Sequence, residues 1–121
     1  MILRIALDTP LRRAFDYRPP ADLPTTAPAH DLKPGVRVRV PFGRRRLVGV
    51  LLETVSESAI EPGKLKAALD ILDQEPIFDP VTFEVLRWAA DYYHHPIGEV
   101  LAAALPAPLR AGQPADERIE T

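Results

Sequence analysis

The feature that most constrains the fold of this 121-residue chain is a run in which valines and arginines alternate. Val36, Val38 and Val40 alternate with Arg37 and Arg39. A period of two is typical of a β-strand whose successive side chains point to opposite faces. The run therefore predicts a strand with three valines on one face and two arginines on the other.

A second apolar run follows closely enough to form a hairpin with the first. Pro41-Phe42-Gly43 ends the first strand, Arg44-Arg45-Arg46 forms a cationic tip, and Leu47 to Val55 reads as the returning antiparallel strand. Gly49, inside that strand, indicates a bulge or a close approach of another backbone.

The rest of the N-terminal half predicts short strands and loops. Residues 2–7 and 15–17 are strand-like, and residues 20–31 form a polar loop rich in proline. Residues 65–72 fit a helix or a strand equally well by spacing, and intrinsic propensity favours the helix.

Two helices are expected after residue 78. Asp79-Pro80 is a helix start, because Asp caps free amides and Pro fits the first helical position. The helix should stop near His95, before Pro96. One face of it should carry Leu86, Ala89, Ala90 and Tyr93. Residues 97–105 predict a second short helix, and residues 111–121 a linker or tail.

Composition excludes several classes of protein. The chain has no cysteine, which leaves no disulfide framework, no cysteine-ligated zinc and no thiol nucleophile. It has no apolar run long enough to span a membrane and no signal peptide, so we expect a soluble cytoplasmic protein. No phosphate-binding glycine motif is present. We therefore expect no enzyme activity from the chain alone.

The net charge of −2 conceals two halves of opposite sign. Residues 1–60 contain ten Lys or Arg against six acids, a charge of +4, whereas residues 61–121 contain five against eleven, a charge of −6. The arginines of the hairpin could grip phosphates. They could equally form a charged strand edge that discourages aggregation.

Asp16 and the histidine pair each allow two interpretations. Asp16 lies between Phe15 and Tyr17. It could pair with a nearby arginine, or accept a hydrogen bond from a nucleic-acid hydroxyl beside aromatic rings. His94 and His95 are adjacent, so they do not converge on one metal ion, and we expect them to terminate the helix.

Four segments together resemble a known family. They are FDY at residues 15–17, VRVPFG at 38–43 with its preceding VR, LKAALDILD with EP at 65–76, and WAADYYHHPIGEV with ALP at 88–106. In this order they resemble the N-terminal domain of primosomal protein N′, the PriA family of bacterial replication-restart helicases. The resemblance covers residues 2–110.

The resemblance implies a fold and a site. The fold would be mainly β (α+β), a small antiparallel barrel-like domain over residues 1–110 with a C-terminal helical piece, in which residues 65–72 form a strand. The domain would bind the free 3′-hydroxyl end of the nascent leading strand at a stalled fork. The 3′-end pocket would consist of Phe15, Asp16, Tyr17, Gly43 and Lys66. The DNA backbone would meet Arg37, Arg39, Arg44, Arg45 and Arg46.

The resemblance also implies what surrounds such a domain. The family's ATP-dependent helicase motor and its zinc-binding cysteines lie downstream, so the chain looks like an N-terminal fragment that needs no zinc, ATP or other cofactor. Expected partners are branched DNA, the rest of the helicase, single-strand-binding protein and primosome proteins. Alternatively, the acidic half with Glu84, Asp91 and Glu99 docks the motor or a single-strand-binding partner.

Overall fold

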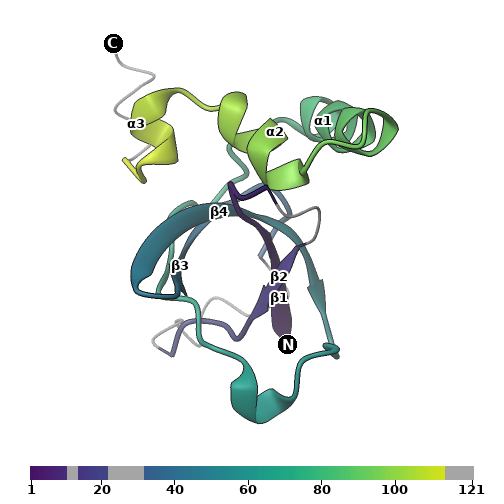
Figure 1. The fold of residues 1–121 in the computed structure, drawn as a ribbon. Helices are drawn as coiled ribbons and strands as arrows, with labels where there is room; N and C mark the ends of the chain where they lie inside the picture. The colour runs from purple at the N-terminus through teal and green to yellow at the C-terminus, as the bar shows by residue number, and fades with distance from the viewer. Residues whose placement is uncertain (11–13, 22–31, 114–121) are drawn as a thin grey trace.

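The strands of this domain form one five-stranded sheet, with a layer of helices on one side of it (Figure 1). The computed structural model describes residues 1–10, 14–21 and 32–113. The strands are β1 (Ile2–Ala6), β2 (Phe15–Tyr17), β3 (Arg37–Phe42), β4 (Arg45–Val55) and β5 (Asp70–Ile71). The helices are η2 (Pro62–Lys64, a 3₁₀ turn), α1 (Pro80–Tyr92), α2 (Ile97–Ala103) and α3 (Ala107–Arg110).

The sheet has the order β2-β1-β4-β3-β5, and each neighbouring pair is antiparallel. It curls strongly (Figure 1). Its two edges approach each other after β2, where a single parallel bridge joins Arg18 to Ala67. The five-stranded sheet confirms the mainly β fold. Among the described residues no ladder closes the sheet, so the term barrel-like holds only loosely.

The predicted hairpin is confirmed as β3 and β4. Its register pairs Phe42 with Arg45, which leaves only Gly43 and Arg44 in the turn. Gly43 has φ +61°, a left-handed conformation that glycine adopts without steric cost. Arg45 and Arg46 therefore belong to β4, two residues earlier than the sequence indicated.

Residues 65–72 form extended structure, so the helical alternative is wrong. β5 pairs Val38 with Ile71 and Arg39 with Asp70. Two further backbone bonds anchor the segment, from Leu69 N to the Arg39 carbonyl and from Leu72 N to the Arg37 carbonyl. Pairing with an exposed edge of β3 overrides the weak helical propensity of these residues.

A first hydrophobic core fills the inside of the curled sheet. Because side chains alternate along each strand, one face of every strand points into this core. Its buried members are Leu3, Ile5, Leu7, Tyr17, Val36, Val38, Val40, Leu51 and Ala68.

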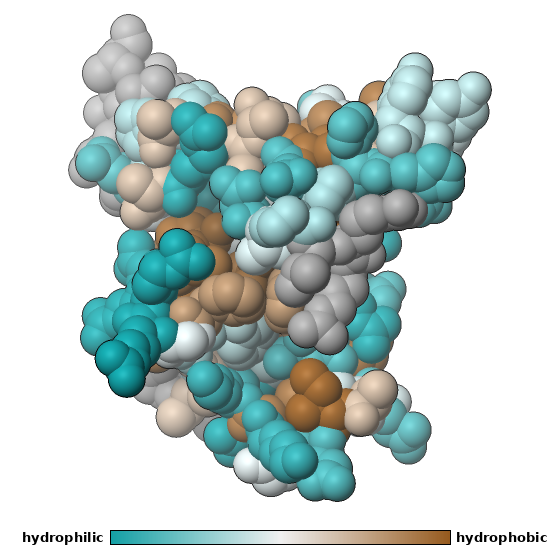
Figure 2. Space-filling model, viewed as in Figure 1, coloured by the Kyte–Doolittle hydropathy of each residue, from teal (hydrophilic) through white to brown (hydrophobic). Residues whose placement is uncertain are grey.

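A second core lies between the outside of the sheet and the helices. β4 is apolar on both faces because Leu51 points into the first core while Val50 and Leu52 meet the helical layer. The remaining buried members are Ala6, Phe78, Phe83, Leu101, Leu105 and Leu109. On the face shown in Figure 2, hydrophobic residues reach the surface in separate patches, one of them where the helical layer meets the strands.

Two glycines permit close backbone approaches, Gly49 within the sheet and Gly98 between the helical layer and the sheet. A Cβ on Gly49 would lie 2.6 Å from the Ala6 carbonyl oxygen, and a Cβ on Gly98 would lie 1.5 Å from the Leu7 carbonyl oxygen. The close approach predicted at Gly49 is thus confirmed. The bulge lies three residues away, where Arg4 pairs with Glu53 and Ile5 with Leu51.

Helix α1 begins as predicted but ends earlier. The Asp79 carboxylate accepts hydrogen bonds from the Thr82 hydroxyl at 2.6 Å and from Thr82 N at 2.9 Å. These contacts, the hydroxyl bond first, lower the Asp79 pKa. The helix ends at Tyr92, and His94 has φ +57°, so the backbone turns before Pro96. Tyr93 is consequently exposed, whereas Ala90 of the same predicted face is buried.

The C-terminal part departs from the prediction in two ways. α2 ends at Ala103, two residues short of the expected helix. A third helix, α3, which the sequence did not indicate, begins at Ala107 between Pro106 and Pro108, and its Leu109 is buried. Of the predicted tail, residues 111–113 are described, while 114–121 and most of the proline-rich loop lie outside the described residues. No described helix is both long enough and apolar enough to cross a membrane.

Candidate DNA-binding site

A pocket of about 230 Å³ lies at the outer edge of β2. Its lining includes all five residues that the resemblance assigns to the 3′ end. The full lining is Phe15, Asp16, Tyr17, Pro41, Phe42, Gly43, Ile60, Lys64 and Lys66. Three segments that are distant in sequence therefore converge: the edge strand β2, the β3–β4 turn, and residues 60–66.

Two aromatic side chains hold the β3–β4 turn beside β2. The Tyr17 hydroxyl donates a 2.8 Å hydrogen bond to the Pro41 carbonyl, and the rings of Phe15 and Phe42 meet edge to face with centroids 5.3 Å apart. Tyr17 is buried, which raises the pKa of its hydroxyl. Its ring therefore shapes the pocket from the core side and offers no face on which a base could stack.

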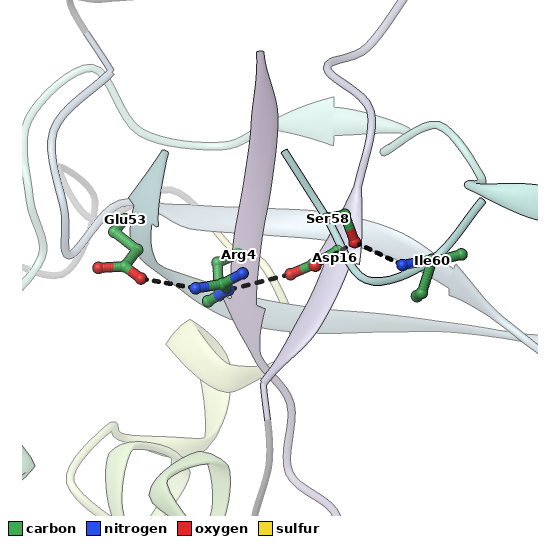
Figure 3. A network of polar contacts seen from close by, with 5 residues as sticks. All are labelled: Arg4, Asp16, Glu53, Ser58 and Ile60. Atoms are coloured by element: carbon green, nitrogen blue, oxygen red, sulfur yellow. Dashed lines mark hydrogen bonds and ion pairs between the residues drawn. The ribbon is translucent and has the colours of Figure 1, made fainter. Parts of the chain in front are cut away.

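The Asp16 carboxylate is fixed on both sides (Figure 3). Arg4 Nε donates to Asp16 Oδ1 at 3.1 Å, and the Ser58 hydroxyl donates to Asp16 Oδ2. Arg4 also donates to Glu53 at 2.9 Å, and Ser58 Oγ accepts from Ile60 N at 3.1 Å. The arginine partner that the sequence allowed for Asp16 is thus present.

The sheet register explains why these charges meet. Arg4 is the direct cross-strand partner of Asp16 on β2 and of Glu53 on β4, and opposed side chains on one face lie within contact distance. Hydrogen bonding to Asp16, the largest effect, raises the Arg4 pKa, so its charge persists. Each carboxylate oxygen of Asp16 has a second lone pair, which leaves it able to accept another hydrogen bond.

The backbone of β2 contributes polar groups to the same edge. Arg18 N donates to the Lys66 carbonyl at 2.9 Å, and Ala68 N donates to the Arg18 carbonyl at 2.8 Å. Backbone groups along a strand point to alternate sides, so Asp16, two residues earlier, directs its N–H and C=O to the same side as Arg18. The main chain of Asp16 can therefore contact a ligand without regard to base identity.

Cationic side chains surround the pocket. Lys64 and Lys66 are exposed on one rim, and Lys64 lies 3.9 Å from Glu61. On the other side, Arg44, Arg45 and Arg46 are exposed beside Gly43. Two lysines in the lining and three arginines on the adjoining turn and the start of β4 outnumber Asp16 and Glu61. This balance favours a polyanion that carries a hydrogen-bond donor at its end.

Comparison with known proteins decides the family. The sequence-family model of the PriA 3′ DNA-binding domain matches residues 4–106 of this chain. The chain belongs to the PriA 3′ DNA-binding domain family.

Relatives of this PriA domain are replication restart proteins. PriA from Haemophilus influenzae is 42% identical over 94% of this chain, and PriA from Treponema pallidum is 33% identical over 89%. PriA from Bacillus subtilis is 31% identical over 82% of the chain. The matched part makes up 15%, 16% and 12% of those relatives, so the chain spans about a sixth of their length or less.

One of the arginines predicted to contact the DNA backbone in this PriA domain is buried. Arg37 has no exposed surface, since its guanidinium binds both oxygens of Asp73 at 2.7 and 2.9 Å. Its Nη1 donates to the carbonyls of Leu109 and Gln113 at 2.8 Å. The prediction that Arg37 contacts DNA is wrong, because α3 and the Asp73 segment cover that face of β3.

Arg39 is half-buried beside the same C-terminal segment. A Cβ on Gly112 would lie 2.3 Å from an Arg39 guanidinium nitrogen, so this side chain packs against the backbone there. Contact of Arg39 with DNA stays a prediction. The same holds for the exposed Arg44 of the turn and for Arg45 and Arg46 at the start of β4, which we call together the turn arginines.

Sequence reasoning missed six residues of the site. Four of them line the pocket, namely Pro41, Phe42, Ile60 and Lys64. The other two, Arg4 and Ser58, hold Asp16. Lys64 ends η2 and Lys66 follows it by two residues, so the available signal was only that two cations lie close together in the sequence. Nothing in the sequence indicated that Ser58 would reach β2, because its loop is placed by the long strand β4.

Proposed function

We propose that this domain binds the free 3′-hydroxyl end of a DNA strand in the pocket at the β2 edge, in the service of replication restart. The observation that carries the proposal is the convergence of Asp16, Gly43 and Lys66 from separate segments on one small pocket beside three exposed arginines. The family description and the names of the relatives agree with it.

The chemistry distinguishes a strand end from a continuing strand. The terminal hydroxyl donates to an Asp16 oxygen, while a phosphate at that position would place negative charge beside the carboxylate and remove the donor. Lys66 and Lys64 neutralise the last phosphodiester, and the turn arginines follow the backbone further along. Affinity thus comes from phosphate contacts and selectivity for the end from Asp16.

The direct test is a titration of a 5′-labelled single strand that ends in a 3′-hydroxyl, against the same strand with a 3′-phosphate, followed by fluorescence anisotropy. We expect the hydroxyl strand to bind about tenfold more tightly, which corresponds to roughly 1.4 kcal/mol. Equal dissociation constants would refute the assignment of the pocket.

Asp16→Asn should reduce the preference of the domain for a strand that ends in a 3′-hydroxyl. The amide keeps the shape but loses the charge that accepts from the hydroxyl, so the preference for the hydroxyl strand should fall to about threefold or less. Binding of the phosphate strand should weaken little or even improve. Glu57→Gln, an exposed acid in the loop after β4, is the matched control and should retain the full preference.

A further inference from the structure

Helix α1 carries a second apolar surface that its own domain does not cover. Phe83 and Ala90 face the core, yet four large side chains on the outer face are 55% to 72% exposed. They are Val81, Val85, Trp88 and Tyr92. Their spacing of four, three and four residues aligns them in one stripe along the helix. We call these four residues the outer stripe.

The aromatic end of the outer stripe is an ordered cluster. The rings of Trp88 and Tyr92 stack with centroids 4.9 Å apart and planes inclined by 21°, and Tyr93 meets Tyr92 edge to face at 4.9 Å. Ring contacts of this kind restrict the rotamers before any partner arrives, which lowers the entropic cost of association.

A groove runs beside the stripe along the length of α1. Three adjoining hollows of about 570, 520 and 330 Å³ share Arg87 as a lining residue. The first lies against Phe78 at the start of the helix, and the last against Ile97 of α2. The Arg87 guanidinium turns inward, 5.8 Å from the Phe83 ring centre and 3.4 Å from the Leu52 carbonyl.

The net charge of α1 is negative, because Glu84 and Asp91 outnumber Arg87, whose guanidinium is turned toward the Leu52 carbonyl. Lys33, which lines the first hollow, is paired with Glu75. Glu84 and Asp91 lie on α1 between the groove and the outer stripe, are exposed, and form no ion pair with any residue that the structure describes. The last turn of α1 contains no basic residue, so the negative end of the helix dipole is also uncompensated by its own helix. Cationic groups of a partner would meet both features.

We propose that the outer stripe and its groove form a docking surface for a basic amphipathic helix of another protein. Apolar side chains of that helix bury the outer stripe, and its flanking lysines or arginines meet Glu84 and Asp91. Anchors at a spacing of four, three and four residues are the pattern by which amphipathic helices are recognised. The surface is separate from the 3′-end pocket, so the proposal does not depend on that function.

Two other occupants fit the surface less well. Single-stranded DNA would stack on exposed aromatic rings, but its phosphates would meet Glu84 and Asp91. A second copy of this domain would oppose two surfaces of the same negative charge, which disfavours association.

The chain contains a single tryptophan, and Trp88 lies within the outer stripe, so its intrinsic fluorescence reports on the surface directly. The probe is a capped 15-residue peptide with leucines in the four-three-four spacing and lysines on its flanks. We expect a saturable blue shift of the Trp88 emission as the peptide is added. A peptide of the same composition in scrambled order should cause none.

Variants of the domain connect the signal to the proposed contacts. Glu84→Gln and Asp91→Asn should each weaken peptide binding about two- to fivefold, and Val85→Ser about tenfold. Leu69→Ser removes an exposed apolar side chain outside both the stripe and the 3′-end pocket and should leave peptide affinity unchanged. Circular dichroism checks that each variant is folded.

Three results would overturn the proposal. The first is the absence of a saturable shift with the lysine peptide, or an equal shift when glutamates replace the lysines. The second is a larger shift with a thymidine oligonucleotide, which would identify a nucleic-acid platform. The third is emission that moves to the red on dilution of the domain alone, which would identify a second copy as the occupant.

Discussion

At the scale of single residues, two ion pairs in this domain differ in how much water reaches them. The side chains of Arg37 and Asp73 are 0% and 8% exposed, while those of Arg4 and Asp16 are 34% and 11% exposed. Each guanidinium nitrogen of the buried Arg37 donates a hydrogen bond inside the protein, to Asp73 or to the carbonyls of Leu109 and Gln113. The Arg4–Asp16 pair only fixes the orientation of the Asp16 carboxylate, which can still accept a hydrogen bond from a ligand.

Arg37→Met should therefore destabilise the domain and not act on DNA directly. Removing the guanidinium leaves the Asp73 carboxylate buried without a counter-charge, and we expect a loss of about 3–5 kcal/mol in the free energy of unfolding. Urea denaturation measures it. Arg44→Ala is the exposed control and should change stability by less than about 0.5 kcal/mol.

A double variant separates the ion pair from simple packing. Replacing Asp73 by Leu together with Arg37→Met removes the orphaned charge, so it should recover part of the lost stability. If Arg37→Met alone lowers the free energy of unfolding by less than about 1 kcal/mol, the Arg37–Asp73 ion pair contributes little to stability.

Tyr17 predicts a loss of stability at alkaline pH. Burial raises its pKa in the folded state, so its contribution is complete below the ordinary tyrosine value of about 10 and is lost as the pH rises through the folded value. Tyr17→Phe should lose about 1 kcal/mol at pH 7 with the hydrogen bond to Pro41. The variant should also show a smaller decline in melting temperature above pH 10. Equal declines in both proteins would contradict this role.

At the scale of elements, period and spacing identify which residues share a face but not what covers that face. The valines of β3 were predicted to share one face, and they do form core. The arginines were assigned to the opposite face, but a long-range contact with α3 and Asp73 buries Arg37. Arg37 is 36 positions from Asp73 and 72 positions from Leu109 in the sequence. No local pattern encodes contacts over such separations.

The candidate site likewise combines features that the local sequence predicts with features that only long-range contacts determine. The resemblance supplied Phe15, Asp16 and Tyr17, and the strand they form is local and short. The pocket around them depends on the length of β4 and on the path of residues 56–66, which set where Ser58 and Lys64 lie. Those placements follow from tertiary packing and not from propensity.

Gly98→Ala should separate the helical layer from the sheet. An added Cβ would overlap the Leu7 carbonyl oxygen, and backbone at that distance cannot yield without moving α2 away from β1. We expect a loss of about 1–3 kcal/mol or more in the free energy of unfolding. Gly63→Ala is the matched control, because nothing lies within 4 Å of its Cβ position, and its stability should be nearly unchanged.

At the scale of the whole molecule, curling of the sheet gathers the basic residues at one place. β2 and β3 are separated by two strands in the sheet order, yet the Tyr17–Pro41 bond brings their ends together. The exposed arginines at the β3–β4 turn consequently border the pocket at β2. A chain with a net charge of −2 can therefore present a locally positive surface to DNA.

The salt dependence of DNA binding tests this arrangement. Each phosphate contact that an arginine makes releases counterions, so Arg44→Ala and Arg46→Ala should each reduce the slope of log affinity against log salt by about 0.7–0.9. The loss should be the same for strands that end in a 3′-hydroxyl or a 3′-phosphate, because these contacts read the backbone only. Arg110→Ala, an exposed arginine on α3, serves as the control and should retain the wild-type slope. Unchanged slopes in both turn variants would place the DNA on a different surface, and a change limited to the 3′-hydroxyl strand would place these arginines in the end pocket itself.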